Sequence, residues 1–229
     1  MAATALSVDS ALPVDWCARL RRGLLSAPDH RFERCRFGAL RAPLSDAARD
    51  QLRARLPEAL HPAAVLLPIV LHPLAPTLLL TVRAAGLRAH AGQISFPGGR
   101  LEPRDADLMA AALRETQEEI GLAASAVEPI GFLTDHIVQS GFRVTPVVGL
   151  VHPGFMLRPD GAEVSEVFEL PLSLALGRSH YRAHQRQLRG VELDLWELPI
   201  GERRIWGATA GILLNLRELL EAQHGGLAA

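Results

Sequence analysis

Three glutamates near the middle of the chain have a spacing that could bind a cation. Glu115, Glu118 and Glu119 directly follow Arg114. Successive residues of an α-helix rotate by about 100°, so the three carboxylates would share one face of a helix. Like charges at this spacing cost roughly a few tenths of a kcal/mol per pair on an exposed helix. A bound cation would relieve that repulsion.

The surrounding segment carries a surplus of acidic groups. From Gly99 to Glu119 the formal charge is −3, with six acids and three arginines. Oxygen ligands without nearby Cys or His pairs favour Mg²⁺ or Mn²⁺ over Zn²⁺. Such a site suits phosphoryl chemistry, in which the metal bridges phosphate oxygens and lowers the pKa of a bound water. The alternative is a solvated acidic face with Arg114 as an ordinary ion-pair partner.

A helix and a glycine turn are expected to position these carboxylates. The pattern predicts a helix from Asp107 to Ile120 that stops at Gly121. Its apolar side would pack against a sheet. Gly98 and Gly99 predict a turn that lets main-chain groups approach a metal.

The rest of the chain predicts a mixed α/β (α+β) fold. Apolar runs of strand length cover 64–72 and 77–84, with further strands at 127–135, 142–151, 164–169, 181–188 and 191–195. Helical spacing appears at 14–25, at 46–56 after the N-cap Ser45, and at 206–222. We expect a helical extension over residues 1–60 and one domain over 61–229. The pattern does not specify the topology of the sheet.

Composition excludes several classes of protein. The chain has 229 residues, 24 basic groups, all of them Arg, and 25 acidic groups, for a net charge of −1. That balance disfavours nucleic-acid and membrane-surface binding. Two cysteines provide no disulfide framework. The uncharged stretch from Ala59 to Val82 contains four prolines, so we interpret it as two buried strands rather than a membrane span. Neither end of the sequence resembles a targeting signal, and a cytoplasmic location is expected.

The acidic segment resembles the Nudix box, G-x5-E-x7-R-E-U-x-E-E-x-G-U, where U is bulky and apolar. The matching positions are Gly99, Arg114, Glu115, Glu118, Glu119, Gly121 and Leu122. Three departures occur. One residue is inserted before Arg114, the first acid is Asp105 rather than Glu, and Thr116 replaces an aliphatic residue.

The resemblance implies a Nudix hydrolase, which cleaves a nucleoside diphosphate linked to another moiety. The family fold is a mixed sheet between helices. Carried over to this sequence, the metal ligands would be Glu115, Glu118 and Glu119 with the Gly99 carbonyl. Arg114 would hold the carboxylates in place, supported by Gly98 and Asp105. The box does not assign the general base, because that residue varies between subfamilies.

A second resemblance concerns the substrate. Residues 79–99, LLTVRAAGLRAHAGQISFPGG, look like the L-L-T-x-R-S-x-x-L-x-x-H-x-G-Q/E-x-x-F-P-G-G signature of coenzyme A pyrophosphatases, with Ala84 in place of Ser. The box insertion with Asp at the first acid is similar to that subfamily. So are SGFRVTPVVG (140–149), EVSEVFELPL (163–172) and IWGATAGIL (205–213).

Several side chains outside the box are candidate site residues. Arg83 and Arg88 could hold substrate phosphates through their planar guanidinium groups. His90 and Gln93 could contact substrate or order their loop. Glu163 and Glu166 are candidate bases, and either could instead be a charge without a role. The remaining candidates are His136 and Ser140 as pocket residues and Trp206 as a core residue.

Together these observations predict a Mg²⁺- or Mn²⁺-dependent hydrolase of the coenzyme A diphosphate. The products implied by the resemblance are 3′,5′-ADP and 4′-phosphopantetheine. We expect Glu115, Glu118 and Glu163 to be catalytic, with Glu115 or Glu163 activating the water. The alternatives are a Nudix hydrolase of ADP-ribose, NADH or a dinucleotide, and a binding protein of the same fold without turnover. A homodimer is expected from the resemblance.

Overall fold

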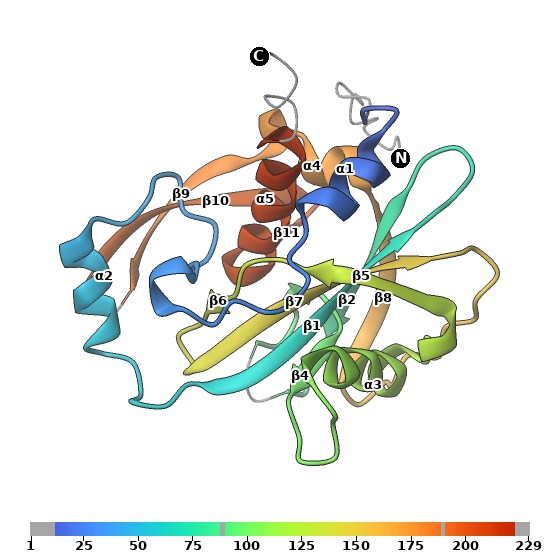
Figure 1. Ribbon diagram of the computed structural model, residues 1–229, viewed down its shortest axis with the longest axis horizontal. Helices are drawn as coiled ribbons and strands as arrows, with labels where there is room; N and C mark the ends of the chain where they lie inside the picture. The colour runs from blue at the N-terminus through green and yellow to red at the C-terminus, as the bar shows by residue number, and fades with distance from the viewer. Residues whose placement is uncertain (1–11, 88–89, 189–190, 223–229) are drawn as a thin grey trace.

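Two sheets and five α-helices make up the computed structural model, which describes residues 12–87, 90–188 and 191–222 (Figure 1). The large sheet contains β1 (His61–Val70), β2 (Thr77–Arg83), β3 (Ile94–Ser95), β4 (Gly98–Arg100), β5 (Val127–Phe132), β6 (His136–Ile137), β7 (Phe142–Val151) and β8 (Val164–Pro171). The small sheet contains β9 (Arg182–Leu188), β10 (Val191–Ile200) and β11 (Arg203–Ile205). The helices are α1 (Trp16–Gly23), α2 (Asp46–Arg53), α3 (Leu108–Ile120), α4 (Leu172–Leu176) and α5 (Gly207–Ala222). Short 3₁₀ turns lie at Phe32–Arg34, Ala124–Ala126 and Arg178–His180.

The large sheet is mixed. Its main path runs β3-β2-β1-β7-β5, with β4 beside β1, β6 beside β7 and β8 beside β2. The long central pair β1 and β7 is parallel, in register from His61 opposite Phe142 to Val70 opposite Val151. The other neighbours of this sheet are antiparallel. The β1–β2 hairpin is the pair of buried strands predicted for the uncharged stretch. No helix in the described ranges is long and apolar enough to cross a bilayer.

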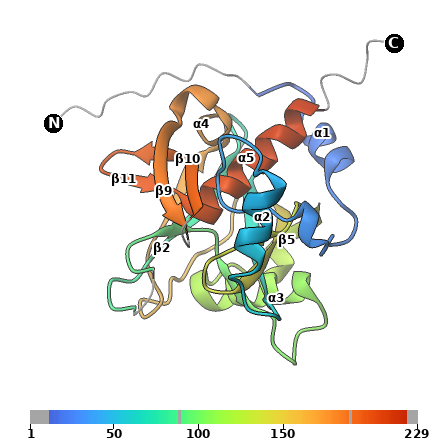
Figure 2. The same ribbon diagram turned by 90° about the vertical axis from the view of Figure 1, so that its left-hand side faces the viewer.

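Strand alternation creates a core on each face of this sheet. Along β1, Leu67 and Ile69 belong to one buried cluster, and Leu66 and Val70 belong to another. The first cluster includes residues of α5 and the second includes residues of α3. Both views place α3 and α5 on opposite sides of the sheet (Figures 1 and 2). Burial of each such aliphatic side chain contributes about 1.5–3 kcal/mol. The predicted mixed α/β sandwich is therefore confirmed.

Several elements differ in extent from the sequence predictions. The first helix is shorter than predicted, and the short strands β3, β4 and β11 and the helix α4 were not predicted. Between α1 and β1 much of the chain is extended and forms single bridges to the sheets, at Leu25, Arg36 and Leu40. These bridges depend on partners far along the chain, which a local pattern does not specify. The division into 1–60 and 61–229 stays a prediction.

A buried carboxylate ties the N-terminal segment to the large sheet. Asp135 is fully buried, and its carboxylate accepts a hydrogen bond from the Thr145 hydroxyl at 2.7 Å. The same carboxylate contacts His30 Nδ1 at 2.7 Å and Arg143 Nε at 3.5 Å. The backbone N–H of Arg36 donates to the Asp135 carbonyl at 2.8 Å. Because the Asp135 carboxylate is shielded from water, these partners must offset the free-energy cost of burying it.

We predict that Asp135→Ala lowers the free energy of unfolding by about 2–3 kcal/mol, because it strands buried partners such as the Thr145 hydroxyl. Urea denaturation measures the change. Asp194→Ala is the matched control, since it removes an exposed ion pair with Arg41 that also joins the N-terminal segment to a sheet. That control should cost less than about 1 kcal/mol. Equal losses in the two variants would contradict the role given to Asp135.

Candidate functional site

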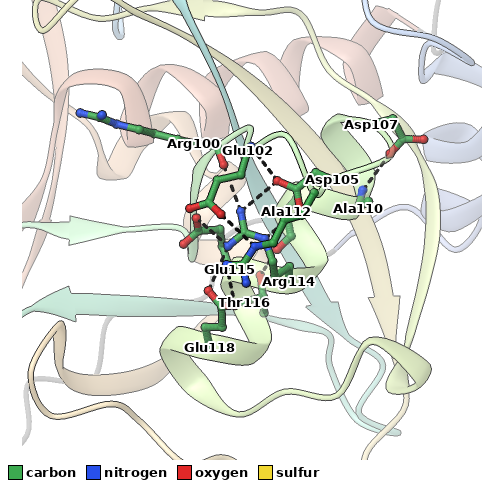
Figure 3. Close-up of polar contacts among 11 residues, drawn as sticks. Arg100, Glu102, Asp105, Asp107, Ala110, Ala112, Arg114, Glu115, Thr116 and Glu118 are labelled. Carbon is green, nitrogen blue, oxygen red and sulfur yellow. Dashed lines mark hydrogen bonds and ion pairs between the residues drawn. The ribbon is translucent and has the colours of Figure 1, made fainter.

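One guanidinium group organises the acidic residues around α3 (Figure 3). Arg114 donates from Nε and Nη2 to the two carboxylate oxygens of Asp105, at 2.8 and 3.0 Å. Its Nη1 donates to Glu115 at 3.0 Å and Glu118 at 2.9 Å, and Nη2 also donates to the Arg100 carbonyl at 3.1 Å. All three nitrogens are engaged, so Arg114 contacts three carboxylates and one carbonyl at once.

The charges of this network shift the pKa values of its members. The hydrogen bonds from Arg114 lower the pKa of Asp105 to about 2. The hydrogen bond to Asp105 raises the pKa of Arg114 in turn, with Glu115 adding to the effect. Asp105 also accepts the backbone N–H of Glu102 at 2.8 Å. Its carboxylate therefore stays ionised and fixes the loop before the helix.

Local contacts explain where α3 begins, where it ends and why it tolerates a threonine. Asp107 is the N-cap and accepts the N–H of Ala110 at 2.8 Å. Gly121 ends the helix with a φ of 72°, which favours glycine. Thr116 is 1% exposed, and its hydroxyl donates to the Ala112 carbonyl at 2.7 Å. The helix backbone thus satisfies the one polar atom at a position that is aliphatic in the box.

The prediction of a turn at Gly98 and Gly99 is wrong, because both residues belong to strand β4 and pair with β1, and close packing requires both glycines there. Gly98 has a φ of 146°, and a Cβ there would overlap the Ala64 carbonyl oxygen. A Cβ at Gly99 would lie 2.5 Å from the carboxyl carbon of Glu115. The Gly99 backbone therefore lies against the Glu115 carboxylate.

Glu119 is the most buried of the three helix glutamates, with 5% of its surface exposed. Its carboxylate accepts the N–H of Gly98 at 3.0 Å. Burial raises the pKa of Glu119 to about 7, opposed by the Gly98 hydrogen bond and by the positive charge of Arg83. Burial also raises the pKa of Glu115, although the bond from Arg114 opposes that shift.

The donor set suits a hard divalent cation but is not gathered around one point. Across the described ranges, no group of three or more His, Cys, Asp or Glu side chains is positioned to hold a metal ion. Arg114 draws Glu115 and Glu118 toward itself, while Glu119 turns toward Gly98. The Glu118 side chain is 50% exposed, so it can rotate away from Arg114 toward a cation. Carboxylate and carbonyl oxygens are the ligands that Mg²⁺ and Mn²⁺ prefer.

A cavity of about 660 Å³ is lined in part by Gly98 and Gly99 of β4. Its lining includes six of the residues singled out from the sequence, namely Arg83, His90, Gln93, Gly98, Gly99 and Ser140. Nδ1 of His90 lies 2.8 Å from Oε1 of Gln93, so these two side chains order their own loop. Arg88 lies outside the described residues. Substrate binding by these side chains stays a prediction.

The expectation that His136 lines the pocket is wrong. Its side chain is fully buried, and it is not among the residues that line the cavity. A Cβ on Gly211 of α5 would lie 2.9 Å from the His136 ring. Burial lowers the pKa of His136 to about 3, so the ring is neutral at pH 7. Its polar character suggested a loop position, but β6 turns the ring into the core.

The structure distinguishes the two candidate bases. Glu166 forms an ion pair with Arg203 at 2.7 Å, and this bond lowers the pKa of Glu166. Glu163 is exposed, and its charge contributes to raising the pKa values of both Glu115 and Glu119. Its backbone carbonyl accepts the N–H of Ala84 at 2.8 Å. Glu163 therefore lies near the helix carboxylates, whereas a surface ion pair occupies Glu166.

Many of the residues that line the cavity were not expected there, and three of them bear on what the cavity could bind. Trp206 was predicted to be a core residue, but it is half-buried and lines the cavity, as do Arg100 and Arg186. The guanidinium carbon of Arg186 lies 4.6 Å from the centre of the Trp206 ring. That of Arg100 lies 4.8 Å from the Phe142 ring. No local pattern marks them, because they come together only when β4, β7 and β9 fold around the same space.

Comparison with known proteins identifies the family to which this chain belongs. A NUDIX domain matches residues 60–191. The chain is 43% identical over 159 residues to a protein of Photorhabdus laumondii named uncharacterized Nudix hydrolase NudL, which covers 69% of this chain and 84% of that protein. The protein of the same name in Cronobacter sakazakii is 42% identical over 181 residues, covering 79% and 89%. A crystal structure of the Nudix hydrolase RenU from M. smegmatis shares the fold at 19% identity, with a TM-score of 0.50, covering 75% of this chain and 91% of that one.

We predict that Asp105→Asn destabilises the protein most above pH 4. The folded-state pKa of about 2 lies below the unfolded value of 3.8, so the stabilisation is present above 3.8 and is lost as pH falls toward 2. Urea denaturation of wild type and variant at pH 7, 5 and 3 measures the difference. Asp50→Asn, on the exposed side of α2, is the control and should change little at any pH. A deficit independent of pH would contradict the assignment.

Proposed function

This chain belongs to the Nudix hydrolases, and from that premise we propose that it hydrolyses the diphosphate of coenzyme A and its derivatives. The products would be 3′,5′-ADP and 4′-phosphopantetheine or its acyl form. One observation carries the proposal. The segment that resembles the coenzyme A signature contributes Arg83, His90 and Gln93 to the wall of the cavity, and the same cavity includes Gly98 and Gly99 beside the helix carboxylates.

Glu115, Glu118, Glu119 and the Gly99 carbonyl would hold Mg²⁺ or Mn²⁺. When bound, such an ion neutralises charge that develops at phosphorus and lowers the pKa of a water ligand. The burial of Glu119 and the close approach of Gly99 to Glu115 support this ligand set. Arg114 keeps Glu115 and Glu118 close together despite their mutual repulsion.

Arg83 is the residue that would bind the diphosphate in this proposal. Its Nε is buried and has no hydrogen-bond partner among the described residues. Its positive charge lowers the pKa of Glu119, so the guanidinium lies within electrostatic range of that carboxylate. A planar guanidinium can donate two parallel hydrogen bonds to phosphate oxygens. Arg83 would therefore orient the diphosphate beside the helix carboxylates.

Glu163 is the general base in this proposal, with Glu115 as the alternative. Its exposed carboxylate lies close enough to Glu115 and Glu119 to influence both. A carboxylate there can accept a proton from a water molecule positioned between it and the diphosphate. Glu115 is less suited to this role because Arg114 already occupies one of its oxygens.

The alternative substrates are ADP-ribose, NADH and dinucleotides. They stay open because Ala84 replaces the Ser of the coenzyme A signature. Incubation of each with Mg²⁺ and chromatography of the products separates the possibilities. Cleavage of coenzyme A to 3′,5′-ADP supports the proposal, whereas preferential cleavage of another substrate overturns it. Cleavage of none of them would favour a binding protein. A cytoplasmic location and a homodimer stay predictions.

We predict that Glu119→Gln lowers kcat for coenzyme A by at least about 100-fold, because an amide cannot replace the charge of a metal ligand. The amide oxygen can still accept the Gly98 N–H, so the fold should persist, which circular dichroism and urea denaturation check. Glu128→Gln, which removes an exposed carboxylate paired with Arg21, is the control. Wild-type turnover in Glu119→Gln would refute the assignment of this face.

We predict that Glu163→Gln lowers kcat by about 100-fold or more without a matching rise in KM, as expected for loss of a general base. Glu166→Gln, three residues along the same segment, should stay within about twofold of wild type because Glu166 is engaged by Arg203. Steady-state kinetics with coenzyme A and Mg²⁺ compare the two variants. A larger loss in Glu166→Gln would transfer the role of base to that residue.

A further inference from the structure

Within the part of the chain that the structure describes, three arginines of the cavity form no ion pair, in contrast to most of the other arginines there. Arg83, Arg100 and Arg186 line the cavity, and none of them has a carboxylate partner among the described residues. Elsewhere, arginines such as Arg114 and Arg203 are neutralised by neighbouring acids. Positive charge that no ion pair engages attracts an anion in a pocket, because low-dielectric walls strengthen the field there. The cavity therefore offers positive charge to an anionic ligand.

Arg186 is held in a geometry suited to phosphate. Its guanidinium lies over the Trp206 ring, 4.6 Å from the ring centre, and the residue is half-buried. Contact with the ring restrains the guanidinium, whose N–H groups project from the edge of its own plane. The ring therefore orients the cation without occupying its donors. The first turn of α5, at Gly207 and Ala208, lines the same part of the cavity and adds a favourable dipole for an anion.

Arg186 and the acidic helix belong to different layers of the molecule. Arg186 is on β9 of the small sheet, whereas Glu119 is on α3 and Gly99 is on β4 of the large sheet. Both views place β9 and β10 away from α3 (Figures 1 and 2). A diphosphate bound beside Glu119 and Arg83 would leave Arg186 without a partner. A ligand that engages Arg186 as well would need a further anionic group.

Arg100 provides a cation on the large-sheet side of the cavity. It follows Gly99 directly on β4, and its guanidinium lies over Phe142. Figure 3 shows its side chain extending away from Arg114 and the helix carboxylates. The Arg100 carbonyl accepts a hydrogen bond from Arg114, but the Arg100 guanidinium points away from Arg114. Arg100 and Arg186 are thus stacked cations on two walls of one cavity.

We propose that Arg186, assisted by Arg100, binds a phosphate monoester carried by the nucleoside of the substrate, separate from the diphosphate that is cleaved. The inference rests on the proposed function and narrows its substrate class to nucleoside diphosphate derivatives with an additional phosphate. In coenzyme A that group is the 3′-phosphate. Dephospho-coenzyme A, ADP-ribose and NADH lack it. Arg186 is therefore a residue that determines specificity.

The first test compares kcat/KM for coenzyme A and dephospho-coenzyme A in the wild type and in Arg186→Gln. Wild type should prefer coenzyme A, and the variant should reduce that preference by about tenfold or more, since a hydrogen bond to a charged group is lost. Arg182→Gln removes an exposed arginine from the same strand outside the cavity and should leave the preference unchanged. Equal losses on both substrates would overturn the proposal.

The second test measures binding without turnover. Isothermal titration of wild type with 3′,5′-ADP and with AMP should show tighter binding of 3′,5′-ADP, and Arg186→Gln should remove most of that difference. Arg186→Lys, which keeps the charge but not the planar fork, should retain part of it. Equal affinity of wild type for the two nucleotides would refute the subsite.

The two tests also separate this inference from the proposed function. If coenzyme A and dephospho-coenzyme A are both resistant while ADP-ribose or NADH is cleaved, the proposed function fails. The titration then decides the subsite independently. If coenzyme A is cleaved but the preference for it over dephospho-coenzyme A is unaffected in Arg186→Gln, the function stands and the subsite fails.

Discussion

The candidate site depends on one charged interaction, the engagement of several carboxylates by the guanidinium of Arg114. Without it, Glu115 and Glu118 would repel each other and the loop before the helix would lose its anchor. The interaction also accommodates the departures from the box. Asp105 is one methylene shorter than Glu and the segment is one residue longer, yet both oxygens of Asp105 reach Arg114. A rigid fork that is always charged can serve so many acceptors, whereas a lysine cannot.

That constraint leaves Glu119 as a different kind of carboxylate. It is buried and is held by a backbone N–H instead of by Arg114, and its pKa rises to about 7. One helix face thus has two environments. Glu115 and Glu118 are bound by Arg114, whereas Glu119 is buried next to Gly98 at the cavity wall. The cavity in turn depends on the N-terminal segment, because Phe37 and Gly38 form part of its wall. The buried Asp135 fixes that segment to the sheet and so connects stability to the shape of the site.

Much of the fold was predictable because local patterns carried it. The strands β1, β2 and β7 are long apolar runs, and α3 has an N-cap, an apolar side and a glycine stop. The short strands β3 and β4 were missed because two or three residues form no period. They exist because of their neighbours, since β4 pairs with β1 at Ala64 opposite Gly99. The parallel pairing of β1 and β7 joins segments too distant for a local pattern to connect.

The sequence by itself determined the acidic helix and the resemblance that goes with it, because helical geometry converts spacing directly into proximity. Only the tertiary structure decided which charges are neutralised. It paired Glu166 with Arg203 and left Glu163 near the helix carboxylates. It buried His136, exposed Trp206 to the cavity and stacked Arg186 on that ring. The physical reason is that pairing and burial depend on contacts between segments far apart in the chain, about which residue type and spacing carry no information.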